Sequence, residues 1–147
     1  MSPKAASILV CAAAIAAGCG GGGDRLTEEL LRERANEICA GLAAQLDAIG
    51  EPTNLAEARD LLEEGQRLLD DALAQLRQLE PPANLEAEYD RFLETGDQAV
   101  ERLGEMSSAA DAEDVEELDR LGELAAQEDE EADEIARGLG FDDCATA

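Results

Sequence analysis

Apolar residues recur every three or four positions through most of the chain beyond residue 26. They fall into four segments, at about 27–49, 55–79, 85–106 and 112–137. This spacing is typical of one face of an α-helix, and no segment shows the alternation of a half-buried strand. The positions on the four stripes are Leu31, Ala35, Ile38, Leu42 and Ile49; Leu55, Ala58, Leu62, Gly65, Leu69, Ala72, Leu76 and Leu79; Leu85, Tyr89, Phe92, Gly96, Ala99, Leu103 and Met106; and Leu118, Leu121, Ala125, Ala132, Ile135 and Leu139.

Residues that stop helices separate the four segments. Because the connections are short and the segments have similar lengths, they predict an all-α fold, an antiparallel four-helix bundle running up-down-up-down. The alternative architecture is a long two-helix hairpin that dimerises. A helix start with capping-box spacing is expected at Asn54 and Glu57. The expected breaks are Gly50 and Pro52, Pro81 and Pro82, a turn over 107–111, and Gly138 and Gly140.

Charge and composition exclude several classes of function. The chain has 147 residues, enough for one compact domain, with 36 acidic and 11 basic residues, a net charge of −25 and no histidine. Binding to nucleic acid needs cations that face phosphates, so this field has the wrong sign, and a basic membrane-surface binder is excluded on the same ground. Histidine-based triads and histidine-ligated zinc sites are absent. We therefore predict no catalytic residues, no cofactor and no dedicated metal site.

The first residues of the chain have the pattern of an export signal. Lys4 precedes a 13-residue apolar run over 5–17, which is too short to span a bilayer but suits the core of a signal peptide. The run ends in Ala16-Ala17-Gly18-Cys19, which resembles the lipobox of bacterial lipoproteins, although Leu is more usual than Ala at position 16. In that class the signal is cut between Gly18 and Cys19, and the Cys carries diacylglycerol and an acyl chain such as palmitate.

This resemblance implies three parts: a signal peptide at 1–18, a lipidated glycine-rich tether at 19–26 and an acidic helical domain at 27–147. Four glycines at 20–23 make a flexible tether. The protein would then be anchored outside the cytoplasm on a bacterial membrane, through its N-terminal lipid alone. The alternatives are lipidation at Cys11, which Val10 disfavours because it is not small, and an ordinary secretory signal with a chance cysteine.

Two cysteines remain beyond the signal and the lipid. Cys39 and Cys144 form an even pair in an oxidising compartment, so we expect a disulfide between them. The alternatives are a buried free thiol at Cys39 and a fraying tail at Cys144. In the expected bundle Cys39 lies roughly 18 Å along the first helix. The tail must therefore climb back along the bundle with Phe141 packing on the way, or the fourth segment must bend or end early near Gln127.

Two further features invite a functional interpretation. The segment 111–134 holds 13 acidic residues and one arginine, but it lacks a calcium-loop pattern, so we interpret it as a solvated helix face with weak, exchangeable cations. Four glycines inside the helical segments would lie at one level of the bundle, and they either allow close helix packing or leave a small apolar cavity. These are Gly41, Gly65, Gly96 and Gly122.

The sequence therefore predicts a non-enzymatic interaction or scaffold module at the cell envelope, with an envelope protein as its partner. The alternative is a protein that binds a ligand or a divalent cation in the bundle interior or on the acidic face of the last helix. The chain is also similar to small helical bacterial lipoproteins with an early Cys, here Cys39, and a late Gly-Leu-x-x-x-x-Cys, here 138–144. That resemblance carries no activity with it.

Overall fold

The computed structural model of the protein describes residues 25–146, and it is built of helices. These are α1 (Glu28–Ile49), α2 (Leu55–Leu76), α3 (Glu86–Asp111) and α4 (Val115–Leu139), followed by the short 3-10 helix η1 (Cys144–Thr146). The described residues contain no strand, so the all-α prediction is confirmed. Within this range, no helix combines the length and the apolar character needed to cross a bilayer.

Polar side chains cap the N-terminal ends of three helices. The side-chain oxygens of Thr27, Asn54 and Asp114 each accept a hydrogen bond from the backbone N–H three residues later, at 3.2, 3.0 and 3.1 Å. Such caps satisfy N–H groups that have no partner inside the helix. The predicted capping box is modified, because the Glu57 carboxylate accepts from the backbone N–H and hydroxyl of Thr53. These hydrogen bonds lower the pKa of Glu57.

The turn predicted over 107–111 is wrong, because α3 continues through these residues. The Ser108 hydroxyl donates to the carbonyl of Gly104 at 2.9 Å, so it does not compete with the helix from a turn conformation. Ala109 and Ala110 are good helix formers and both are buried. The connection to α4 is shorter than expected and occupies residues 112–114.

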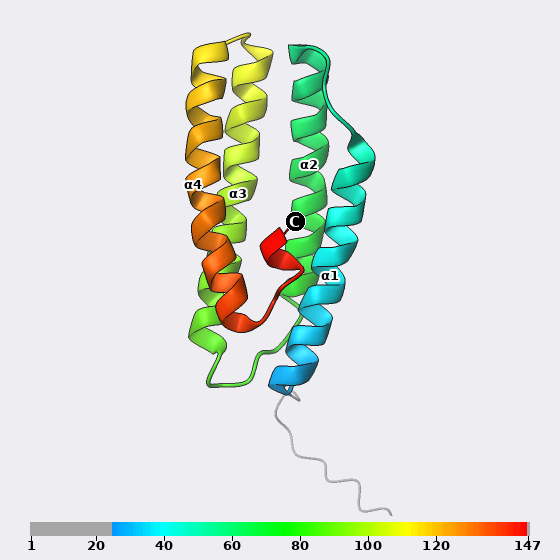
Figure 1. The fold of residues 1–147 in the computed structure, drawn as a ribbon, viewed down its shortest axis with the longest axis vertical. Coiled ribbons are helices and arrows are strands. Elements are labelled where there is room, and N and C mark those ends of the chain that lie inside the picture. Colours follow the sequence, from blue (N-terminus) through cyan, green and yellow to red (C-terminus); the bar gives the residue numbers. More distant parts are fainter. Residues whose placement is uncertain (1–24, 147) are drawn as a thin grey trace, which may run out of the picture.

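Consecutive helices run in opposite directions along the bundle, as the colours in Figure 1 show. The start of α1 meets the end of α2, where the N–H of Leu26 donates to the carbonyl of Glu80 at 2.8 Å. The start of α2 meets the end of α3, where Arg59 pairs with Asp111 at 3.1 Å. Helix α1 packs along α2, α2 along α3, and α3 along α4.

Helices α1 and α4 do not pack along each other; the C-terminal segment, residues 140–146, lies between them and contacts both (Figure 1). Helix α4 is continuous to Leu139, so the early end near Gln127 is wrong. The tail turns back and climbs along the bundle with Phe141 completely buried. Of the two routes open from the sequence, the chain takes the returning tail.

A glycine makes this reversal possible. Gly140 follows the last residue of α4 with φ +77°, a left-handed conformation that favours glycine. The N–H of Phe141 donates to the carbonyl of Ala136 at 2.8 Å and that of Gly140 to Arg137 at 3.1 Å. A Cβ at Gly140 would also lie 2.8 Å from Nε of Arg32. Position 140 therefore needs glycine both for its backbone angle and for space.

Polar groups of α1 hold the returning tail. Arg32 Nε donates to the carbonyl of Leu139 at 2.9 Å, and Asn36 Nδ2 donates to the carbonyl of Gly140 at 3.2 Å. The Asn36 side-chain oxygen accepts from the N–H of Asp143 at 2.9 Å. The amide of Asn36 thus holds the tail with both a donor and an acceptor, as the backbone of a neighbouring β-strand would.

The main core lies at the end of the bundle where the tail enters. Phe141 meets Tyr89 and Phe92 edge-on, with ring centroids 6.0 and 5.3 Å apart, a favourable aromatic geometry. The Tyr89 hydroxyl donates to the carbonyl of Leu76 at 2.6 Å, and burial raises the pKa of Tyr89. The other buried members of this core are Leu31, Ala35, Leu73, Leu76, Ile135, Ala136, Leu139 and Ala145.

Candidate functional site: a cavity between the helices

The tip of the tail meets the middle of α1 at two cysteines. The sulfurs of Cys39 and Cys144 lie 2.09 Å apart, at the distance of a disulfide bond, and their Cα atoms are 4.9 Å apart. The expected pairing therefore agrees with the geometry, and it closes a sequence separation of 105 residues. Both cysteines line one end of a cavity in the bundle.

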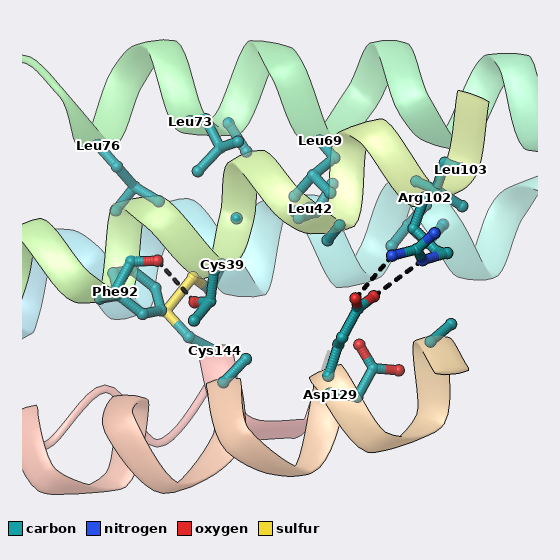
Figure 2. Close-up of a pocket in the computed structure, with 18 of the residues that line it drawn as sticks. Cys39, Leu42, Leu69, Leu73, Leu76, Phe92, Arg102, Leu103, Asp129 and Cys144 are labelled. Atoms are coloured by element: carbon teal, nitrogen blue, oxygen red, sulfur yellow. Dashed lines mark hydrogen bonds and ion pairs between the residues drawn. A yellow bond between two sulfur atoms is a disulfide. The ribbon is translucent and has the colours of Figure 1, made fainter. Parts of the chain in front are cut away.

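This cavity has a volume of about 260 Å³ and is lined mainly by apolar side chains of all four helices (Figure 2). A second, more open apolar hollow of about 460 Å³ shares four of its lining residues and extends it toward the opposite end of the bundle. The shared residues are Leu46, Leu69, Leu103 and Met106. Together the two hollows form an apolar trough. We call the first of them, the one of about 260 Å³, the interhelical cavity.

The cavity exists because small residues occupy several stripe positions where a closed bundle has large ones. Gly96 and Ala99 on α3, and Ala125 and Ala132 on α4, all line it. The tail fills the space between α1 and α4 only as far as Cys144. Beyond that point Leu46, Leu69 and Leu103 stay only partly buried, whereas Leu31, Leu76 and Leu139 in the core around Phe141 are buried. The tail therefore fills the bundle at one end and leaves it partly hollow beyond, although Leu121 is buried there as well.

One end of the cavity is charged. Figure 2 shows Arg102 and Asp129 at this end, opposite the disulfide and Phe92. Arg102 donates to both carboxylate oxygens of Glu128 at 3.0 and 2.8 Å, a two-point geometry that guanidinium groups favour. It also pairs with Glu105. The Arg102 and Glu128 side chains are only 17% and 25% exposed, so this bridge is better shielded than the other ion pairs of the described residues.

Asp129 stands beside this bridge without an ion-pair partner among the described residues. The residue is exposed, but partial burial of its carboxyl, followed by repulsion from Asp133 and Glu128, raises its pKa. The guanidinium of Arg102, the one basic group among the residues that line the cavity, already pairs with Glu105 and Glu128. The charged end therefore has an excess of negative charge.

We expect the Asp129→Asn variant to be more stable than the wild type at pH 7. A raised pKa in the folded state means that ionised Asp129 opposes folding, and that stability is lost as pH rises through that pKa. The gain, about 0.2–0.5 kcal/mol for relief of one like-charge pair, should vanish near pH 3, where the wild-type carboxyl is protonated too. Urea unfolding at both pH values measures it. Asp70→Asn, an exposed acid on α2 that has no other acid three or four positions away, is the control for overall charge. An equal gain there would contradict the local explanation.

The four glycines do not act together as the sequence suggested. Gly65 and Gly96 line the apolar trough, but a Cβ added at Gly41 or Gly122 would have no neighbour within 4 Å. At Gly96, by contrast, a Cβ would lie 3.2 Å from Cδ1 and 3.3 Å from Cγ of Leu73, and closer still to Cδ2. Only Gly96 therefore supports a close approach of two helices, between α2 and α3.

The pair Gly96→Ala and Gly122→Ala tests this difference. Alanine at position 122 should stabilise the protein by about 0.5–1 kcal/mol, because it favours the helix and meets open space. At position 96 the same helical gain is opposed by displacement of the buried Leu73 side chain, which costs about 1–3 kcal/mol. Thermal unfolding should therefore rank Gly122→Ala above Gly96→Ala. Equal melting temperatures would show that Leu73 moves into the cavity without cost.

Several predicted positions lie outside the described residues or carry no site. Cys19 and Gly18, with the signal peptide at 1–18, fall outside the structure's range, as does Cys11. Within 25–146, no group of three or more acidic or cysteine side chains could hold a metal ion. Most acids of segment 111–134 lie on α4, and four of them pair with arginines of α3 or of α4 itself. These are Glu117, Glu128, Glu131 and Asp133.

The grouping of Arg102, Glu128 and Asp129 was missed at the level of sequence. The sequence offers one signal for this grouping. Arg102 directly precedes Leu103, an apolar stripe position of the third segment, so it lies at the edge of the face that packs on other helices. That signal becomes useful only once α3 and α4 are known to pack together, as they do here. No protein-family model, curated protein or solved structure matches this chain.

Proposed function

We propose that this protein is a lipid-anchored, non-enzymatic binding protein of the bacterial cell envelope, which holds an apolar ligand in the interhelical cavity. The observation that supports it is the cavity itself, an apolar hollow of about 260 Å³ that all four helices line. Ligand sites are typically concave, mostly apolar and supplied with a few polar groups at defined positions. The bridge between Arg102 and Glu128 and the carboxylate of Asp129 are such groups.

The N-terminal pattern supports the location. Gly18-Cys19 closes the apolar run, and four glycines separate it from α1. Mass spectrometry of the native protein should find a chain that begins at a diacylglyceryl-modified Cys19, and Cys19→Ala should release the protein from membranes. An unmodified thiol at position 19 would refute the anchor but leave the binding function open.

Two features support binding over catalysis and over the scaffold role. Of the two carboxylates at the cavity, Glu128 is held by Arg102, so no second acid is available to work with Asp129 as an acid–base pair. Among the described residues, Val115 alone is a large hydrophobic side chain that is well exposed, at 52%. Outside the cavity there is thus little apolar surface for a protein partner.

Nile red, a neutral apolar dye, tests the cavity directly. We expect saturable one-to-one binding to the chain from position 19 onward with Cys19→Ser, which keeps every residue of the described fold. Ala125→Leu should abolish binding by filling the cavity, whereas Ala126→Leu, one position along on the exposed side of α4, should not. No binding by a folded wild-type protein, or equal binding by both variants, would overturn the proposal.

A further inference from the structure

We infer that the interhelical cavity selects an amphipathic cation, with one apolar chain inside the cavity and a positively charged head beside Asp129. This inference rests on the proposed function and adds the chemical class of the ligand. It follows from three properties of the cavity: its apolar lining, its size and the sign of the charge at one end.

The lining separates a chain-binding part from a head-binding part. From the disulfide to the charged end, the walls are leucine, alanine and phenylalanine side chains, with Thr95 as the one hydroxyl. That hydroxyl donates to the carbonyl of Phe92 at 2.8 Å and is therefore already engaged. A charged head placed deep in the cavity would lose its water and meet at most this one hydroxyl oxygen, which is unfavourable. The polar part of a ligand must therefore stay at the charged end.

The size of the cavity restricts the apolar part. Its volume of about 260 Å³ lies just below the range of roughly 300–1,000 Å³ for small-molecule sites. One unbranched chain suits this space better than a lipid with two acyl chains. The adjoining hollow along Leu46 and Leu69 offers room for a longer chain to continue.

The charge at the polar end selects the head group. The two negative charges of Glu105 and Glu128 outweigh the single positive charge of Arg102, with which both pair. Asp129 adds a third negative charge. An anionic head would meet this excess and would have to displace Glu128 to reach the guanidinium. A cationic head instead gains an ion-pair partner in Asp129 and relieves its repulsion from Glu128 and Asp133. Partial burial of the carboxyl, followed by repulsion from Asp133 and Glu128, raises the pKa of Asp129. The net charge of −25 attracts cations over longer distances as well.

Calorimetry with three matched probes tests the selection: octyltrimethylammonium, octyl sulfate and octyl glucoside, each below its micelle concentration. At an ionic strength of about 0.15 M, where long-range attraction is screened, we expect one-to-one binding of the cation. It should bind roughly tenfold more tightly than the neutral probe, the effect of one added ion pair near a protein surface. The sulfate should bind more weakly than both. Tetramethylammonium, a head without a chain, should not bind saturably.

Two variants test whether Asp129 causes the preference for the cationic probe. Asp129→Asn should remove most of the preference for the cation, measured as the ratio of the affinities for the cationic and the neutral probe on the same variant. Asp119→Asn removes the same charge from the same helix away from the cavity, and it should keep the preference. Because Asp129→Asn is expected to fold at least as stably as the wild type, a lost preference cannot be ascribed to unfolding.

The outcomes separate this inference from the proposed function. Equal affinities for the three octyl probes, with Nile red still bound, would overturn the selection of cations and leave an apolar binding site. An equal loss of preference in Asp119→Asn and Asp129→Asn would also overturn it, because overall charge would then be the cause. If neither Nile red nor any octyl probe binds the folded protein, the binding function fails as a whole.

Discussion

Breaking the link between Cys39 and Cys144 should lower the free energy of unfolding by up to about 4.7 kcal/mol, the value expected for a loop of about 100 residues in the unfolded chain. The two sulfurs join the middle of α1 to the end of the tail across 105 residues. A link of this span restricts the unfolded chain strongly while the folded chain keeps its hydrogen bonds from Asn36. Urea unfolding of Cys39→Ala/Cys144→Ala against the wild type measures the loss.

The matched control for this prediction is the reducing agent itself. Reduction should lower the unfolding midpoint of the wild type and leave that of the double variant unchanged. Thiol titration of the oxidised wild-type chain should detect no reactive group at either position. A midpoint that does not move on reduction, or a wild type as stable as the double variant, would show that the link contributes nothing to the stability of the fold.

The second large effect is expected from Phe141→Ala, at about 3–5 kcal/mol. Phe141 is completely buried and lies edge-on to both other aromatic rings of the core, those of Tyr89 and Phe92. Its removal leaves a void between α1 and α4, because the tail, rather than direct packing of these two helices, fills that space. Urea unfolding of the oxidised variant gives the magnitude, and Val115→Ala, an exposed position, is the control.

A double-mutant cycle tests whether Phe141 and the disulfide hold one unit. If the tail docks as a whole, Phe141→Ala should be less destabilising in the Cys39→Ala/Cys144→Ala background, since part of the tail is already released. The N–H of Asp143 is hydrogen-bonded to Asn36 in the folded protein. Its hydrogen exchange should therefore become faster in each variant that releases the tail. Strictly additive losses would mean that the aromatic plug and the covalent link act independently.

The helices were predictable because the apolar period is a local property of the chain. Each stripe can be found from its own spacing, and the residues that end it lie next to it in sequence. The error over 107–111 arose because Ser107 and Ser108 occur in turns as well as in helices. The buried environment of Ala109 and Ala110 decides the matter in favour of the helix, and that environment is supplied by segments far away in sequence.

The site was predictable only in part. Two cysteines, Cys39 and Cys144, remain beyond the signal and the lipid site. This even number predicted the pair that the structure brings together. The glycine level was wrong for Gly41 and Gly122, which are neighbours of stripe positions rather than members. One position along a helix is a rotation of about 100°, so a neighbour of the stripe faces outward. Asp129 could not be recognised among 13 acids, because what distinguishes it is the cavity beside it.

The sequence by itself determined four amphipathic helices, an acidic surface and a pair of cysteines, since each depends on residue type and local spacing. Only the tertiary structure decided that the tail returns between α1 and α4, that its filling stops at Cys144, and that a hollow with a charged end lies beyond. The reason is physical: periodicity tells which face of each helix is apolar. Whether those faces meet depends on the volumes that several distant segments bring to the same place.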